Sequence, residues 1–191
     1  KTTLQKSFEC YGFQPIETPA MERLETLSGN YGEEGERLIF KILNSGEKVK
    51  KADLASLEAG EYKRFSQSLS EKALRYDLTV PLARYVAQHY NELSFPFRRY
   101  QIQPVWRADR PQHGRFQEFY QCDADIIGER SLWQEVEMVR LYDSAFKALG
   151  LKGTKLKINH RNILASIAEC IDAKDKLNDL TVTLDKWDKV G

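Results

Sequence analysis

Polar side chains of complementary charge alternate along two stretches of this sequence, residues 99–107 and 116–126. Alternate residues of an extended strand point to the same side, so the polar residues of each stretch share one side. If the chain turns back between the stretches, Arg107 lies on the same side as Gln121 and Asp125. The other side is apolar, with Tyr100, Ile102, Pro104 and Trp106 on the first strand and Phe116, Tyr120, Cys122, Ala124 and Ile126 on the second. A guanidinium, an amide and a carboxylate would then face one space.

The loop between these strands concentrates positive charge. It has two turn-forming residues, Pro111 and Gly114. Its basic residues are Arg107, Arg110, His113 and Arg115. Planar guanidinium groups bind phosphate oxygens through paired hydrogen bonds, which suits a polyphosphate. A hairpin with one solvated face is the ordinary alternative, and the cations at the tip favour the phosphate site over it.

The composition is that of an ordinary globular domain and restricts the class of partner. Of 191 residues, 41% are hydrophobic and 30% are charged. The 29 basic and 28 acidic residues give a net charge of +1, so any contact with nucleic acid must come from a local patch. Cys10, Cys122 and Cys170 are far apart and odd in number, which favours reduced thiols in a cytoplasm. No apolar run has the length needed to span a bilayer, so no membrane contact is expected.

The sequence contains no recognisable metal-binding motif and neither of the two common nucleotide-binding motifs. His89, His113 and His160 have no partner at a ligand spacing, so we expect no bound structural metal. There is no Walker A sequence and no GxGxxG. The basic loop is therefore the candidate phosphate site.

The helices expected from apolar spacing are well separated along the chain. One contains Leu4, Phe8 and Tyr11 and should end at Gly12, and a long one over residues 132–149 should end at Gly150. From Arg161 onward the chain is also predicted to be helical. Thr79 is placed to cap a further helix, which brings Asp77 to the helix N-terminus. An acid there often serves only to balance the helix dipole.

Short strands are predicted between these helices. They cover residues 14–18, residues 38–43, a segment that ends near Arg75, and residues 155–159. Residues 44–68 are polar and small and predict a mobile loop with one helical turn.

Several spaced segments resemble one family. Residues 105–121, VWRADRPQHGRFQEFYQ, resemble motif 2 of class II aminoacyl-tRNA synthetases in the form carried by histidyl-tRNA synthetases. Residues 11–19, YGFQPIETP, resemble motif 1, and residues 74–79, LRYDLT, resemble the histidine-binding segment upstream of motif 2. Residues 28–35 and 38–43 also read as that family.

The resemblance implies an α+β fold, a class II synthetase-like antiparallel sheet flanked by helices and incomplete on its C-terminal side. Residues 1–160 would form the catalytic core with motifs 1 and 2, and residues 161–191 would begin a helical insertion. A later histidine motif, a motif 3 arginine and an anticodon-binding domain are absent from these residues, and the sequence starts at Lys1 without Met. We therefore expect a piece of a synthetase that is inactive alone.

The resemblance also implies a function and roles for site residues. The intact enzyme would be a cytoplasmic homodimer that activates histidine with ATP and Mg²⁺ and transfers it to tRNA(His). The histidine site would comprise Asp77, Thr79 and Gln121 at the α-amino group, Arg107 at the carboxylate and Asp125 at the imidazole. The ATP site would comprise Arg107, as the catalytic residue at the α-phosphate, Asp109 near the adenine, Arg115 at the outer phosphates and Phe116 stacked on the base. The family usually has Glu where Asp109 stands.

A second class of protein shares this fold. Some bacteria use a synthetase-like subunit as a histidine-sensing regulator of ATP phosphoribosyltransferase, without aminoacylation. Arg107 and Arg115 favour the enzyme, because a sensor of histidine has no need of a triphosphate clamp.

Overall fold

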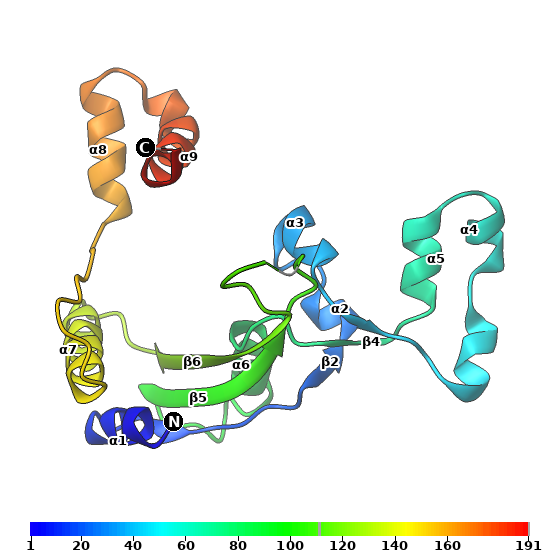
Figure 1. The fold of residues 1–191 in the computed structure, drawn as a ribbon, viewed down its shortest axis with the longest axis horizontal. Coiled ribbons are helices and arrows are strands. Elements are labelled where there is room, and N and C mark those ends of the chain that lie inside the picture. The colour runs from blue at the N-terminus through cyan, green and yellow to red at the C-terminus, as the bar shows by residue number, and fades with distance from the viewer. Residues whose placement is uncertain (111, 191) are drawn as a thin grey trace. The chain divides into compact units, whose positions relative to one another are not determined.

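The computed structural model describes the backbone of residues 1–110 and 112–190, and the side chains of these residues except 33, 34 and 185–190. It divides into two compact units, Lys1–Gly150 and Leu151–Gly191. The first unit contains α1 (Thr2–Cys10), β1 (Gln14–Pro15), β2 (Met21–Arg23), α2 (Leu24–Leu27), α3 (Gly32–Arg37), β3 (Lys41–Ile42), the 3-10 helix η1 (Gly46–Lys51), α4 (Leu54–Glu58), α5 (Tyr62–Ser68), β4 (Lys72–Leu74), α6 (Thr79–Gln88), β5 (Phe97–Trp106), β6 (Glu118–Ile127) and α7 (Trp133–Ala148) (Figure 1). The second contains α8 (Arg161–Cys170), η2 (Lys174–Lys176) and α9 (Leu177–Val190).

A long antiparallel hairpin forms the centre of the first unit. β5 and β6 pair over ten positions, and β1 adds to β5 in parallel, giving the order β1-β5-β6. Arg99 lies opposite Asp125, and Gln103 lies opposite Gln121. This register confirms the predicted hairpin and places the polar residues of both strands on one side of the sheet.

The apolar side of this sheet carries the main core. Phe8 of α1, Tyr100 and Ile102 of β5, and Leu141 of α7 are buried together, with Ala124 of β6 packed against them. Gly12 and Gly150 follow α1 and α7 with φ of +78° and +73°, a conformation that glycine adopts without strain. Both predicted helices and their ends are confirmed.

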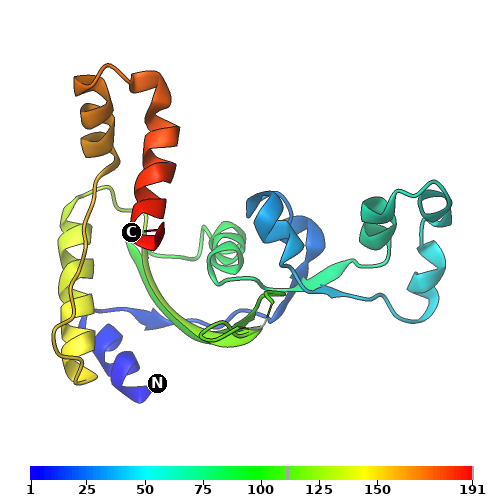
Figure 2. The ribbon, with the colours of Figure 1, turned by 45° about the horizontal axis from the view of Figure 1, so that its top comes forward.

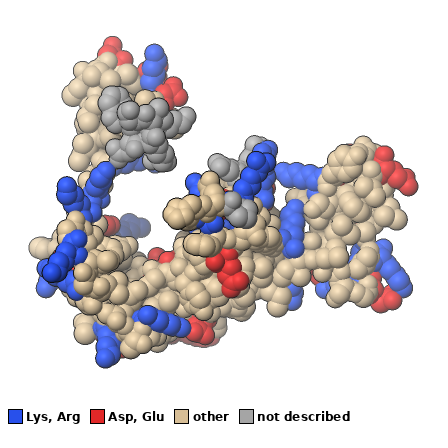
Figure 3. Space-filling view, viewed as in Figure 1, with Lys and Arg blue, Asp and Glu red and all other residues tan. Residues whose placement is uncertain are grey.

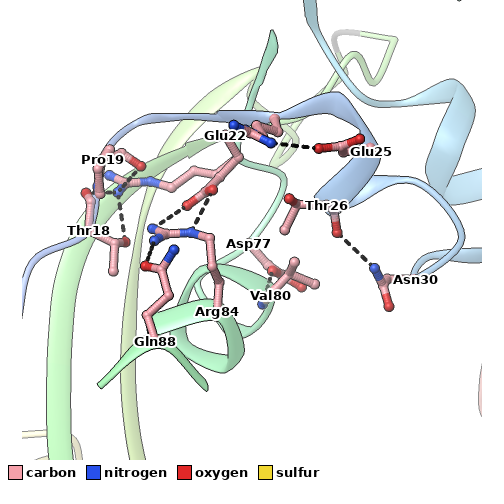
Figure 4. A network of polar contacts seen from close by, with 12 residues as sticks. Thr18, Pro19, Glu22, Glu25, Thr26, Asn30, Asp77, Val80, Arg84 and Gln88 are labelled. Carbon is pink, nitrogen blue, oxygen red and sulfur yellow. Dashed lines mark hydrogen bonds and ion pairs between the residues drawn. The ribbon is translucent and has the colours of Figure 1, made fainter. Parts of the chain in front are cut away.

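Helix α6 lies on the opposite, polar side of the hairpin. The ring of Tyr85 in α6 is 6.4 Å from that of Phe97, which shares a side with Arg99. Figure 2 shows α6 within the curve of β5 and β6. Arg84 of α6 binds Glu22 of β2 through two 2.8 Å contacts, from Nε to Oε2 and from Nη2 to Oε1. This bidentate pair, drawn in Figure 4, ties α6 to the second sheet.

The second sheet is small and antiparallel, in the order β2-β4-β3. Leu27, Ile39 and Ala73 are its buried apolar cluster. Two main-chain bonds join it to the hairpin: Trp106 donates to Arg75 O over 3.1 Å, and Ala108 donates to Leu38 O over 2.8 Å. These bonds bring the end of β5 beside the segments that follow β4 and α3.

Some sequence expectations are wrong. Residues 44–68 hold η1, α4 and α5 rather than a loop with one helical turn. Asp53 caps α4 by accepting from Ser56 N over 3.1 Å, a local bond that stabilises so short a helix. The strands expected at residues 14–18 and 38–43 shrink to β1 and β3. Residues 155–159 are not a strand, since no described strand lies beside them to complete their hydrogen bonds.

The second unit is a helical segment. His160 caps α8, with its Nδ1 accepting from Asn162 N over 3.2 Å. Helix α8 packs against α9 and buries Ala168. The helical prediction after residue 160 is confirmed. Among the described residues no helix has the length and apolarity to cross a membrane.

Candidate active site

The basic loop between β5 and β6 forms one wall of a cavity of about 600 Å³. The other walls come from α3 and from the segment after β4. The lining residues are Tyr31, Gly35, Leu38, Tyr76, Arg107, Asp109, Gly114, Arg115, Phe116 and Phe119. Four residues predicted to bind ATP, Arg107, Asp109, Arg115 and Phe116, therefore meet at one cavity.

Arg107 is held between two aromatic rings. Its guanidinium carbon lies 4.3 Å from the ring centre of Tyr76 and 5.1 Å from that of Phe119. Its Nε donates to the Tyr76 carbonyl over 3.2 Å. Within the described part of the chain, Nη1 and Nη2 make no hydrogen bond. These contacts restrain the guanidinium and leave Nη1 and Nη2 available to an anion.

The loop positions the other cavity residues more loosely. Arg115 Nη1 lies 3.8 Å from Asp109 Oδ1, and the Asp109 carbonyl accepts from Gln117 Nε2 over 3.1 Å. Phe116 is 68% exposed, so one ring face is open for stacking. Gly114 has φ of +78° in the turn. Pro111, the other predicted turn residue, lies outside the described residues.

Asp77 stands at the start of α6 and receives three hydrogen bonds on Oδ1. They come from Tyr31 Oη at 2.8 Å, Thr79 N at 3.1 Å and Val80 N at 3.3 Å. Figure 4 shows the bond from Val80 to Asp77. Burial and the neighbouring Asp77 raise the pKa of Tyr31 well above its usual value. The predicted cap by Thr79 is wrong: Thr79 is the first helical residue, and the Asp77 carboxylate makes the capping bonds because it precedes the free amides.

Gln121 and Asp125 lie farther along the polar side of the hairpin and do not line the 600 Å³ cavity. Gln121 Oε1 is buried and has no hydrogen-bond partner among the described residues. Asp125 Oδ2 lies 2.6 Å from Nη2 of the fully buried Arg99. The predicted residues thus fall into two groups and a helix start. The cavity group is Arg107, Asp109, Arg115 and Phe116. The strand group is Gln121 and Asp125, and Asp77 and Thr79 lie at the start of α6.

Asp123 connects the two groups electrostatically. Burial raises its pKa, Asp125 and Asp77 raise it further, and Arg99 and Arg107 lower it. It stands opposite Gln101, on the side shared by Gln121 and Asp125. Charged groups at both ends of the site, Arg107 and Asp77 at one end and Arg99 and Asp125 at the other, therefore act on the same carboxyl group.

Sequence reasoning assigned no role to several of these residues. The alternation along the strands is enough to place three of them, Arg99, Asp123 and Phe119, on the polar side of the hairpin. The contact between Tyr31 and Tyr76 could not be predicted from the sequence, because these rings, 4.8 Å apart, come from distant segments.

The distribution of charged and metal-ligating side chains over the described residues bears on ligand binding. On the face drawn in Figure 3, Lys and Arg lie in separate groups rather than in one continuous patch. Among the described residues no group of three or more His, Cys, Asp and Glu side chains could hold a metal ion.

Comparison with known proteins identifies the family. The family model described as Histidyl-tRNA synthetase matches residues 51–190. The histidine-tRNA ligase of Christiangramia forsetii is 63% identical over 189 residues, which are 99% of this chain and 41% of that protein. The histidine-tRNA ligase of Flavobacterium johnsoniae is 58% identical over 99% of this chain and 44% of its own length. The chain thus spans about two fifths of the length of these curated relatives.

A solved structure supports the same assignment. The crystal structure of histidyl-tRNA synthetase from Nostoc sp. PCC 7120 matches with a TM-score of 0.75 and 31% identity, covering all of this chain and 37% of that one. The fold is accordingly the α+β fold of class II synthetases, as the motif resemblance implied. With matched sequence over nearly its whole length and a matched fold, this chain belongs to the histidyl-tRNA synthetase family.

Proposed function

We propose that this chain is part of the catalytic domain of a histidine-tRNA ligase, which activates histidine with ATP and transfers it to tRNA(His). The observation that carries this proposal is Arg107, fixed between Tyr76 and Phe119 with the outer edge of its guanidinium available. Such a group binds a phosphate or a carboxylate through two parallel hydrogen bonds.

The reaction has two steps. A carboxylate oxygen of histidine attacks the α-phosphorus of ATP, the bond to the bridging oxygen breaks, and pyrophosphate leaves. The terminal ribose hydroxyl of the tRNA then attacks the carbonyl carbon of histidyl-adenylate, loses its proton, and AMP leaves. Such chemistry depends on positioning and on stabilising negative charge that develops in the transition state. Arg107 would contribute to both by holding the α-phosphate and the amino-acid carboxylate.

The histidine end of the site lies toward the strand group. Asp77, whose Oδ2 has no hydrogen bond with the described residues, would receive the α-ammonium, assisted by Thr79. Gln121 would also bind the α-ammonium. Its Oε1 is buried and has no hydrogen-bond partner among the described residues, and an ammonium donor would satisfy it. Asp125 would accept from the imidazole ring. A buried polar group left unpaired is costly, so such a site rejects amino acids that lack the matching donor.

The ATP end lies at the cavity. Phe116 would stack on the adenine, Asp109 would lie near it, and Arg115 would reach the outer phosphates. The described residues offer no cluster of three metal-ligating side chains. Mg²⁺ would therefore arrive with ATP and be held largely by phosphate oxygens, which are the hard ligands that it prefers.

We also propose that the complete enzyme is a cytoplasmic homodimer. Residues 13–19 resemble the interface motif of the family, and β1 pairs with β5 alone among the described strands. An isologous contact would bury the same patch on both copies. In this arrangement residues 1–160 are the catalytic core and residues 161–191 begin a helical insertion. Light scattering of the folded enzyme tests the dimer, and a monomeric mass would contradict it.

The rival function is histidine sensing without catalysis. The crystal structure of an ATP phosphoribosyltransferase regulatory subunit/histidyl-tRNA synthetase from Bacillus halodurans C matches with a TM-score of 0.60 and 25% identity, covering 80% of this chain and 33% of that one. The available edge of Arg107 and the exposed Arg115 favour a protein that uses ATP. Histidine-dependent exchange of pyrophosphate into ATP by the complete protein decides between them, since a sensor would show none.

A further inference from the structure

The polar side of the hairpin contains a guanidinium group withdrawn entirely from solvent. The Arg99 side chain is 0% exposed, and its Nη2 lies 2.6 Å from Asp125 Oδ2. Burial lowers the pKa of Arg99, whereas Asp125 and Asp123 raise it. A buried cation is costly unless carboxylates compensate it, and these two carboxylates do so.

A chain of buried hydrogen bonds fixes the position of Arg99. Its Nη1 donates to Gln101 Oε1 over 3.1 Å, and Gln101 Nε2 donates to Thr18 Oγ1 over 2.7 Å. The Thr18 carbonyl accepts from Nη1 of Arg75, itself 1% exposed, over 2.6 Å. Connected polar groups in a buried setting restrain one another. The guanidinium is therefore a rigid support and not a mobile surface charge.

The two carboxylate oxygens of Asp125 have different surroundings. Its Oδ2 is buried against Arg99, yet the side chain as a whole is 37% exposed. Oδ1 is not among the buried unpaired polar atoms and has no hydrogen bond with the described residues, so it remains available to a ligand on the polar side of the sheet. One oxygen is thus anchored to the protein while the other is presented.

We propose that Arg99 is a positioning residue for histidine recognition, which holds the Asp125 carboxylate so that Oδ1 faces the ring nitrogen of the bound amino acid. This inference rests on the proposed function and adds to it a residue that need not touch either substrate. Without the guanidinium, Asp125 can turn away from the ring, and its charge adds to that of Asp123 without compensation. The loss should fall on histidine binding and spare the ATP end, where Arg107 and Arg115 act.

The test uses the complete ligase and histidine-dependent ATP–pyrophosphate exchange, with each substrate varied separately. Arg99→Met should raise the KM for histidine about tenfold and leave the KM for ATP within about twofold. Arg99→Lys keeps the charge and one donor direction, so it should recover part of the loss. A merely structural role would move both KM values and kcat together.

A matched control is available on the neighbouring residue. Arg98 also pairs with a carboxylate, with Nη2 2.6 Å from Glu137 Oε2, but points to the other side of the sheet. Arg98→Met removes a similar ion pair from the same strand. It should change neither KM, and a histidine-selective effect of Arg98→Met equal to that of Arg99→Met would overturn the proposal.

A double-mutant cycle tests whether Arg99 acts through Asp125. In an Asp125→Asn background, Arg99→Met should change the KM for histidine little, because the carboxylate that it positions is gone. Additive effects would overturn the inference, as would an unchanged KM for histidine in Arg99→Met alone. If the wild-type ligase shows no histidine-dependent exchange, the proposed function itself fails, which is a different result.

Discussion

The hydroxyl of Tyr31 donates to Asp77 over 2.8 Å and joins residues 46 positions apart in the sequence. The Tyr31 ring also lies 4.8 Å from that of Tyr76, whose ring in turn stacks with Arg107 at 4.3 Å. A continuous path of contacts therefore runs from the proposed amino-group site at Asp77 to the proposed phosphate site at Arg107. The segment around α3 is what links the two ends.

The two roles of Asp77 can be separated by substitution in the complete enzyme. Asp77→Asn keeps a side-chain oxygen for the amides of Thr79 and Val80 and loses the charge that would bind the α-ammonium. We expect the KM for histidine to rise about tenfold or more, because a hydrogen bond to a charged group is lost, and stability to change little. Asp77→Ala should lose about 1 kcal/mol of stability in addition. Exchange kinetics and denaturant unfolding measure the two effects, and an unchanged KM in Asp77→Asn would remove Asp77 from the site.

Tyr31 should make the folded chain sensitive to alkali. Its pKa is raised in the folded state, first by burial and then by Asp77, so the folded state holds the proton more tightly than the unfolded state. The stabilisation is complete below the unfolded tyrosine pKa of about 10 and is lost as the pH rises beyond it. Tyr31→Phe should therefore reduce the fall in unfolding free energy between about pH 9 and about pH 11.

Denaturant unfolding of the 191-residue chain at several pH values measures the slope of unfolding free energy against pH. Tyr62→Phe is the control, because Tyr62 is 71% exposed in α5; it should keep the wild-type slope. Parallel slopes for Tyr31→Phe and wild type would show that Tyr31 is not the group responsible.

The parts of the fold that sequence predicted are those with a repeating local signal. Alternation over ten residues specified β5 and β6, and the register Arg99↔Asp125 follows from the way the loop turns the chain. Apolar spacing ended by a glycine specified α1 and α7. Residue type and order also predicted the basic loop and the place of Asp77 at the start of a helix, whereas the binding role of Asp77 came from the motif resemblance and stays a prediction.

What sequence missed depends on contacts between distant segments or on very short elements. The Tyr31–Asp77 bond has no local signature, and alternation placed Arg99 and Asp125 on one side without showing that they pair. Helices α4 and α5 are five and seven residues long, too short for apolar spacing to indicate. Residues 155–159 have strand-like composition, but composition cannot supply the neighbouring strand that hydrogen bonds require.

Gly128, just after β6, should resist substitution for a steric reason. Its φ is +86°, and a Cβ there would lie 2.5 Å from Cδ1 of Phe95. Gly12 has a similar φ of +78° with nothing within 4 Å of the added atom, so Gly12→Ala serves as the control for backbone strain alone. Gly12→Ala should cost about 1 kcal/mol, and Gly128→Ala at least about 1 kcal/mol more. Denaturant unfolding of the two variants measures the difference, and equal losses would show that Phe95 moves aside freely.

The two arginines of the cavity should separate in kinetics because only one is fixed. Arg107 stacks between Tyr76 and Phe119, whereas Arg115 is 63% exposed and lies 3.8 Å from Asp109. In the complete enzyme, Arg107→Ala should lower the exchange rate constant by a factor of about 100 or more, since it removes a donor to charge that develops in the transition state. Arg107→Lys should restore little, because an ammonium group cannot stack as a plane or bind through two parallel bonds.

Arg115→Ala should instead raise the KM for ATP several-fold and change kcat less, because an exposed side chain at the outer phosphates contributes mainly to ground-state binding. Exchange measured over a range of ATP concentrations, at saturating histidine, distinguishes the two patterns. If Arg107→Lys turned over at a near-normal rate, the fixed guanidinium plane would not be the feature that stabilises the transition state. If Arg115→Ala lowered kcat as strongly as Arg107→Ala, the loop would close on the phosphates during reaction and the two arginines would act together.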